Sequence, residues 1–286
     1  MPFGYSLFLK SSGKSENTIT GYIKTINSFL YYLDTLYGKQ RELYEITPSD
    51  IKSFLKYKID EGNNIKTTNK QLATLKGFFD YLWINDKVPI DPAVKIKRYT
   101  DSVDEKISNI TYEMLLKTLR EVNRNSNYSV LRKVIFLLAT KGLRGTEFQF
   151  HKDSVIDHGD SVELKLKKHS IILDGEDAGL LLNHYYESQF NGSTFVFVTK
   201  KHDESIVPIE LMSIYTHLNA ITEDYGYPDK ITLNTIRHAF AYYLYTKKRF
   251  SIEQVANLLG IENNSAAQLI RNSVERHMKK EVLEIQ

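Results

Sequence analysis

Apolar residues recur at helical spacing along most of this 286-residue chain. Between Ser15 and Leu36 they fall three or four positions apart, which places them on one face of a helix. Alternation of apolar and polar residues, which is typical of strands, is clear only between Ser161 and Leu173. The patterns therefore predict a mainly α protein of the α+β class with one small β-sheet.

Three amphipathic helices are expected in the first part of the chain. Thr47 is a good N-cap for one of them, and Pro48 suits its first helical position because a proline lacks the N–H that would go unpaired there. The expected helices run over 15–36, from 47 to Gly62, and from about Lys66 to the turn before Pro89.

A domain boundary is expected where this pattern stops, after Pro89 and Pro92. We predict a helical domain over 1–98, a linker over 99–108 and a second domain over 109–286. In the second domain we expect further helices and a hairpin over 161–173, with 194–198 as a third strand and 141–147 as a turn into another helix.

The net charge of +3 is unevenly distributed. Residues 1–98 contain 15 basic and 10 acidic residues, a net charge of +5, and the remainder contains 23 basic and 25 acidic residues, a net charge of −2. An excess of this kind suggests a polyanionic partner for the first domain, although the excess is small and a solvated basic surface is its more frequent explanation.

Several classes of protein are excluded by composition and motif spacing. The chain has no cysteine, which rules out a disulfide framework, a thiolate zinc site and a cysteine nucleophile. Its glycines never fall at GxGxxG or GxxxxGK spacing and its eight histidines never at HExxH, so we expect no cofactor and no metal. No signal or membrane-spanning segment stands out, and we expect a cytoplasmic protein.

Three segments of the second part stand out because of their order. They are TKGLRGTE with Arg144, the basic hairpin residues Lys165, Lys167 and Lys168, and TLNTIRHAF with Arg237. This set resembles the catalytic domain of the tyrosine recombinase (phage integrase) family. The segment from Val255 to Gly260 is similar to the LGH turn of that family.

The first part resembles the helical, SAM-like core-binding domain of the same family. The matching residues are Ser15, Thr18, Tyr22, the run from Thr67 to Leu72, and Asp91 to Ala93. The resemblance therefore covers nearly the whole chain. It implies a core-binding domain followed by a tyrosine-recombinase-like domain with a small sheet.

The resemblance also implies a chemistry for the matching residues. In this family a tyrosine attacks a DNA phosphodiester, two arginines hold the charge on the phosphate, and His and Lys handle protons. By resemblance Arg144 and Arg237 are the two arginines, and Lys167 or Lys168 is the hairpin lysine. Arginine suits such a position because its planar fork binds two phosphate oxygens at once.

The chain departs from the family pattern at three positions. Asn234 stands where the family has a histidine, Ile261 where it has His or Trp, and Ile270 where it has the attacking tyrosine. No tyrosine follows Tyr245, and the nearby hydroxyls of Ser265 and Ser273 have no evident base. We therefore expect no catalytic residue and no enzyme activity.

Double-stranded DNA is the partner that the resemblance implies. The residues expected to contact it are Arg144, Lys167, Lys168, Arg237, His238, Lys66, Thr67, Asn69, Lys70, Lys76 and Arg271. Lysines provide phosphate contacts, and the small polar side chains between them suit base edges. The basic C-terminal helix, with Arg271 in it, suits DNA or a second subunit, so we also expect a homo-oligomer on DNA.

Structural roles are the alternatives for these residues. Arg144 has the spacing for an ion pair with Glu147, and Arg237 and His238 suit a structural role beside an apolar step. The lysines of the third helix also suit a solvated face. The region from Ser251 to Val274 also fits a generic helix-turn-helix.

The sequence thus favours a sequence-specific DNA-binding regulator, in the manner of the recombinase-fold repressors of SPβ-type Bacillus phages, which it resembles. Such a repressor acts on the DNA of a phage or mobile element inside a bacterial host and responds to a protein or peptide inducer that the sequence does not identify. The alternatives are a site-specific recombinase with a displaced nucleophile and an accessory recombination factor.

Overall fold

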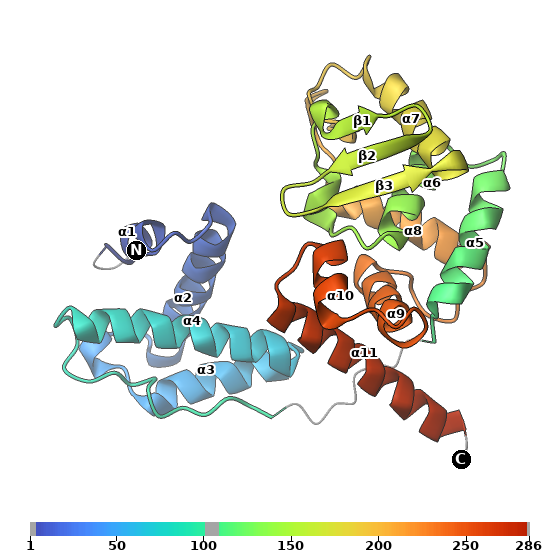
Figure 1. The fold of residues 1–286 in the computed structure, drawn as a ribbon. Coiled ribbons are helices and arrows are strands. Elements are labelled where there is room, and N and C mark those ends of the chain that lie inside the picture. The colour runs from blue at the N-terminus through green and yellow to red at the C-terminus, as the bar shows by residue number, and fades with distance from the viewer. Residues whose placement is uncertain (1–3, 101–108, 285–286) are drawn as a thin grey trace. The chain divides into compact units, whose positions relative to one another are not determined.

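The computed structural model describes residues 4–100 and 109–284, with side chains described through His277. The chain divides into two compact units, Met1–Asp104 and Glu105–Gln286, and each unit has a hydrophobic core of its own (Figure 1). Of the expected linker over 99–108, residues 101–108 lie outside the described residues.

Helices form the first unit. They are α1 (Tyr5–Ser11), α2 (Glu16–Tyr37), α3 (Pro48–Asp60) and α4 (Ile65–Ile84), with a short 3-10 helix over Leu43–Glu45. The side chains of Ser15 and Thr47 cap α2 and α3, as the sequence predicts. The cap of α4 is Asn64, so this helix begins at Ile65. Helix α1 was not predicted from the sequence.

Aromatic rings fill the core of the first unit. Phe29 of α2 lies edge-on to Phe54 of α3 and to Phe79 of α4, with centroid distances of 5.2 and 6.2 Å. All three rings are fully buried. Because each helix contributes a ring to the same cluster, the packing fixes how α2, α3 and α4 cross.

The second unit is built around a buried helix, α6 (Val130–Thr140), in which seven consecutive residues from Val134 are buried. Its other helices are α5 (Tyr112–Arg124), α7 (Gly175–Ser188), α8 (Leu211–Asp224), α9 (Leu233–Thr246), α10 (Ile252–Leu259) and α11 (Asn263–Glu284). Helix α6 is apolar on nearly every side because α5, α7, α8 and α9 all pack against it.

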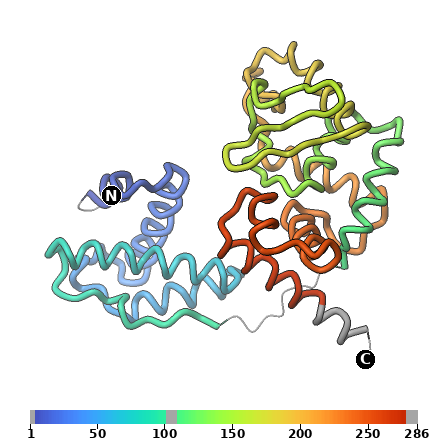
Figure 2. The backbone as a smooth tube through the Cα atoms, in the orientation of Figure 1, coloured from blue at the N-terminus to red at the C-terminus, as the bar shows by residue number. Residues whose placement is uncertain are grey.

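Two small sheets complete this unit. Strands β1 (Val155–Asp157), β2 (Ser161–Lys165) and β3 (Ser170–Asp174) form an antiparallel sheet in that order. Strands β4 (Val198–Lys200) and β5 (Ile206–Pro208) pair separately. Figure 2 shows the β2–β3 turn reaching toward the end of α10.

Two local predictions for this unit are wrong. The strand expected over 194–198 begins only at Val198 and pairs with β5, because Phe195 makes just an isolated bridge to His151. The helix expected after Lys141 is only a 3-10 helix over Gly145–Phe148, since Gln149 leaves helical geometry. Within the described residues no helix combines the length and apolarity needed to cross a membrane.

Candidate functional site

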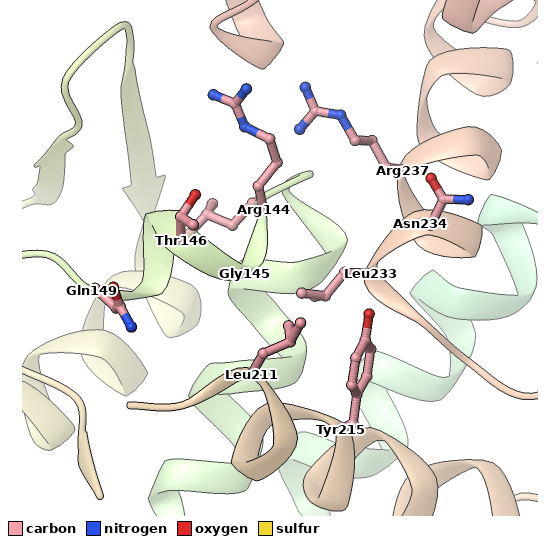
Figure 3. A pocket seen from close by; sticks show the side chains of 10 residues that line it. Arg144, Gly145, Thr146, Gln149, Leu211, Tyr215, Leu233, Asn234 and Arg237 are labelled. Carbon is pink, nitrogen blue, oxygen red and sulfur yellow. The ribbon is translucent and has the colours of Figure 1, made fainter. Parts of the chain in front are cut away.

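A pocket of about 350 Å³ lies where the 3-10 helix Gly145–Phe148, α8 and α9 meet (Figure 3). Its apolar wall contains Leu143, Leu211, Tyr215 and Leu233, and its polar wall contains Arg144, Thr146, Gln149, Asn234 and Arg237. The two arginine side chains extend in the same direction with their guanidinium groups side by side (Figure 3). The structure thus brings together two residues that are 93 positions apart in the sequence.

Arg237 is a fixed, buried cation. Its side chain donates from Nη1 to the carbonyl oxygen of Gly142 at 2.6 Å and from Nη2 to the carbonyl oxygen of Leu259 at 3.1 Å. Burial lowers the pKa of Arg237, and the charge of Arg144 lowers it further. The guanidinium therefore joins the turn after α6 to the end of α10.

Gly142 makes this junction possible. Its φ of +89° lies in the left-handed region, and a Cβ at this position would lie 2.6 Å from Cδ2 of Leu259. A side chain here would therefore push α10 away from the turn and move the carbonyl group that Arg237 binds.

Arg144 has a different environment, because its side chain is 41% exposed and pairs with Glu147. Its backbone N–H also donates to Glu147 Oε2 at 2.7 Å, so the ion pair expected from the spacing is present. The hydrogen bond to Glu147 raises the pKa of Arg144. Its Nε atom is buried and has no hydrogen-bond partner.

The three positions that depart from the family pattern lie in three different environments. Asn234 is exposed and lines the pocket, at the start of α9. Ile261 is half-buried and packs against the core of the second unit. Ile270 is itself a core residue, with an exposure of 5%.

Ser273 has an imidazole neighbour, contrary to the expectation from the sequence. Its Oγ lies 2.8 Å from Nδ1 of His238 and donates to the carbonyl oxygen of Leu269 at 2.7 Å. Because the single hydroxyl proton goes to Leu269, the proton between Ser273 and His238 belongs to the imidazole. Ser273 is 1% exposed, and the pair holds α9 against α11.

The basic hairpin residues lie at the end of β2 and in the β2–β3 turn. Lys165 ends β2, and Lys167 and Lys168 are exposed in the turn that follows. The next residue, His169, packs against Gly260. Sequence reasoning missed His169, because no motif links it to Gly260, which lies 91 positions later.

Two of the α4 residues expected to contact DNA instead hold the segment that follows α4. Asn69 donates from Nδ2 to the carbonyl oxygen of Tyr99 at 2.8 Å and accepts from the Tyr99 N–H at 2.9 Å. Lys76 Nζ donates to the carbonyl oxygen of Val94 at 3.1 Å. Lys66, Thr67 and Lys70 are exposed on the same helix.

A basic groove of about 560 Å³ lies between α3 and this segment. Lys52 and Lys56 line it from α3, and Lys95 and Lys97 line it from the segment. These four lysines are exposed and form no ion pair among the described residues. Ile96, between the last two, is buried and anchors the backbone there. We call Lys52, Lys56, Lys95 and Lys97 the lysine groove.

The remaining predicted residues belong to the C-terminal region. Arg271 is exposed on α11, and its Nε pairs with Glu275 Oε1 at 2.8 Å. The basic side chains of this helix beyond His277 lie outside the described residues. Among the residues that the structure describes, no group of His, Asp or Glu has the arrangement of a metal site.

Known proteins resemble this chain along nearly its whole length. Residues 4–84 match the family model for the phage integrase N-terminal SAM-like domain. Tyrosine recombinase XerD of Oceanobacillus iheyensis is 23% identical over 287 residues, which cover 93% of this chain and 91% of XerD. The TnP I resolvase of Bacillus thuringiensis is 25% identical, and the alignment covers 97% of this chain and 97% of the resolvase.

Solved structures agree with these matches. A lambda integrase(75-356) dimer bound to a COC′ core site superimposes with a TM-score of 0.67 at 17% identity, covering 93% of this chain and 92% of that one. The Tn1549 transposon integrase in complex with transposon right end DNA superimposes with a TM-score of 0.67 at 14% identity, and the match covers 96% of this chain and 97% of that integrase chain. The chain has the tyrosine recombinase fold. The prediction of a SAM-like first domain and a recombinase-like second domain is confirmed.

One prediction is contradicted by these comparisons. We expected no enzyme, yet relatives that align over nine-tenths of both chains are named tyrosine recombinases, which points to an enzyme. The expectation rested on Ile270, which stands where the family has its attacking tyrosine, and on the absence of a tyrosine after Tyr245. Counting along a chain does not establish which hydroxyl group reaches a phosphate in the assembled site.

We predict that Arg237→Met destabilises the second unit by about 2 to 4 kcal/mol, because two buried carbonyl groups lose their hydrogen-bond donor. Urea unfolding, followed through the tyrosine signal, measures this change. Arg271→Met is the matched control, since it removes an exposed arginine paired only with Glu275, and a much smaller change is expected. Equal effects of the two substitutions would contradict a structural role for Arg237.

Proposed function

We propose that the chain binds specific sites in duplex DNA of a phage or another mobile element and regulates transcription there. The paired guanidinium groups of Arg144 and Arg237 carry the proposal, because two adjacent cations at a pocket wall suit a phosphate anion. The partnerless Nε of Arg144 supports it, since a phosphate oxygen provides the missing acceptor.

Duplex DNA is the polyanion that the relatives favour. The lambda integrase and Tn1549 integrase structures that this chain resembles both contain DNA. The lambda integrase in that complex is a dimer, which supports a homo-oligomer on DNA as the assembly of this chain.

The lysine groove extends the proposed contact into the first unit. Its four ammonium groups repel one another in the free protein, and a phosphate backbone relieves that repulsion. Lys52 and Lys56 lie about one helical turn apart on α3, about 6 Å along its axis, so both ammonium groups are on the side of the helix that lines the groove.

Fewer residues of α4 are left to contact DNA bases than the sequence predicts. Both hydrogen-bonding groups of the Asn69 side chain are already used by Tyr99. Thr67 and Lys70, which are exposed at the start of α4, are the α4 residues proposed to contact base edges.

If the lysine groove binds phosphates, its lysines contribute to the salt dependence of DNA affinity. The double variants Lys52→Gln/Lys56→Gln and Lys95→Gln/Lys97→Gln should each reduce the slope of log affinity against log salt concentration by about 0.9 for every lysine removed. Electrophoretic mobility shift at several salt concentrations measures the slope. The variant Lys14→Gln/Lys39→Gln removes two exposed lysines of the same unit outside the groove, and its slope should match that of the unaltered protein.

If Arg144 contacts a DNA phosphate, its removal should weaken both DNA binding and regulation. Arg144→Ala should weaken binding to a duplex selected from random sequence by about tenfold to a hundredfold, with little change in the selected sequence, because a phosphate contact carries no base information. A reporter gene with the selected site in its promoter should then lose its response to the protein. Arg120→Ala, an exposed arginine of α5 outside the pocket, is the control. Full affinity and full regulation in Arg144→Ala would refute the proposed role of the pocket.

DNA strand transfer is a second candidate, favoured by the named recombinase relatives. In that reaction a side-chain oxygen bonds to the phosphorus atom, the bond to the 5′ oxygen breaks, and the released 5′ oxygen takes up a proton. Because no tyrosine follows Tyr245 in the sequence, the attacking hydroxyl would differ from the one that the family pattern implies.

A nicked duplex that contains the selected site separates the two candidates. A protein–DNA adduct that survives denaturing electrophoresis supports strand transfer, and mass spectrometry of the adduct then identifies the attacking residue. A reporter response at a bound site that yields no adduct supports regulation by binding.

A further inference from the structure

We infer that His169 is a third phosphate-contacting side chain at the Arg144–Arg237 pair and that it makes DNA binding depend on pH. The inference rests on the proposed function, because it takes a DNA phosphate as the ligand of that pair. Neither the family matches nor the sequence motifs assign a role to this histidine.

The position of His169 is fixed by a close contact between two distant turns. The Leu166 N–H donates to the His169 carbonyl oxygen at 2.9 Å and closes the β2–β3 turn. The ring rests on Gly260, where an added Cβ would lie 2.1 Å from His169 Nδ1. Gly260 has a φ of +60° as the C-cap of α10, so glycine is favoured there both by the backbone and by the ring that covers it.

The same turn binds Arg237. The carbonyl oxygen of Leu259 accepts a hydrogen bond from Arg237 Nη2, and the next residue, Gly260, carries the imidazole of His169. His169 and Arg237 therefore contact consecutive residues of one turn. Arg144, whose guanidinium lies beside that of Arg237, also acts electrostatically on His169 (Figure 3).

The Nδ1 atom of His169 faces Gly260, so Nε2 is the ring nitrogen left to contact a phosphate. His169 Nδ1 is buried and has no hydrogen-bond partner. His184 and His217 also contain buried nitrogen atoms without partners, so this property alone does not single out His169. What distinguishes His169 is that its ring lies on the turn whose Leu259 carbonyl oxygen accepts a hydrogen bond from Arg237.

The surrounding charges give the direction of the pH effect. Burial lowers the pKa of His169, the carboxylate of Glu147 opposes this shift, and Arg144 and Arg237 add to it. Lys167 and Lys168 of the same turn are exposed to solvent. The imidazole is thus neutral at neutral pH in the free protein.

A bound phosphodiester reverses this balance, because its negative charge offsets the two arginines and favours the protonated ring. Since the pKa of His169 is then higher in the complex than in the free protein, binding takes up a proton. The added affinity is present below the free-protein pKa and is lost as the pH rises through the pKa of the complex. It amounts to about tenfold for each unit by which DNA raises the pKa.

Nuclear magnetic resonance of the imidazole groups in the full chain tests this directly. The probe is a random-sequence duplex at low salt, and the His169 signal is assigned from its absence in His169→Gln. We expect the titration midpoint of His169 to move to higher pH when the duplex is added. The signal of His158, an exposed histidine that pairs with Glu163, is the control and should not move when the duplex is added at constant pH. An unchanged His169 midpoint in a saturated complex would overturn the inference.

Affinity measurements provide the second test. Between about pH 6 and pH 8 the unaltered protein should bind the duplex more weakly as the pH rises. His169→Gln keeps a polar side chain of similar size without the titration, so its affinity should change much less over this range, whereas His158→Gln should behave like the unaltered protein. Retention of the full pH dependence in His169→Gln argues against the role of His169.

The outcomes separate this inference from the proposed function. If the unaltered protein binds no duplex, the proposed function fails, and the inference fails with it. If it binds the duplex but His169 does not respond, only the inference fails. Thermal unfolding of both glutamine variants verifies that they are folded, and the titration of the unaltered protein stands if His169→Gln does not fold.

Discussion

The second unit depends on the two hydrogen bonds that the Arg237 guanidinium donates to the carbonyl groups of Gly142 and Leu259. These bonds join the turn after α6 to the end of α10, two places that no sheet or helix connects. A buried guanidinium is costly unless its donors are paired, and here backbone carbonyl groups pair them without neutralising the charge. The positive charge therefore persists at the wall of the pocket.

The same junction explains why glycines lie around it. Gly142 lets the turn approach Leu259, and Gly260 leaves room for the His169 ring. Each glycine adopts a left-handed backbone conformation at a point where a second segment is in van der Waals contact. Gly142 and Gly260 thus determine how closely the turn after α6, the end of α10 and the β2–β3 turn approach one another beside the arginine pair.

In the first unit, polar side chains of a helix hold a neighbouring segment in place. Asn69 and Lys76 of α4 bind backbone groups of the segment that follows the helix, and Ile96 anchors that segment in the core. The segment is thereby held beside α3 with its lysines exposed. Two side chains of α4 that look like ligand-binding residues in the sequence therefore hold the segment that carries Lys95 and Lys97.

Local features of the fold were predictable because they depend on neighbours in the chain. The helices that begin after Ser15 and Thr47 and the β2–β3 hairpin follow from spacing and capping. The short 3-10 helix after Arg144 and the separate β4–β5 pair were mispredicted, because tertiary contacts and not local periodicity decide them. Strand pairing with β5 needs a partner that the periodicity of 194–198 does not reveal.

The sequence by itself determined the helical fold, the ordered arginines and the excess of positive charge in the first 98 residues. Only the tertiary structure decided which of those residues are available to a ligand. It showed that Arg237 keeps its charge at the pocket wall while two of its donors bind backbone carbonyl groups, and that Asn69 is committed to the backbone of Tyr99. It also showed that the lysine groove forms no ion pair among the described residues and that His169 lies on the turn that binds Arg237. The physical reason is that a hydrogen bond or a steric contact depends on distance in space, and residues 91 to 95 positions apart meet only after folding.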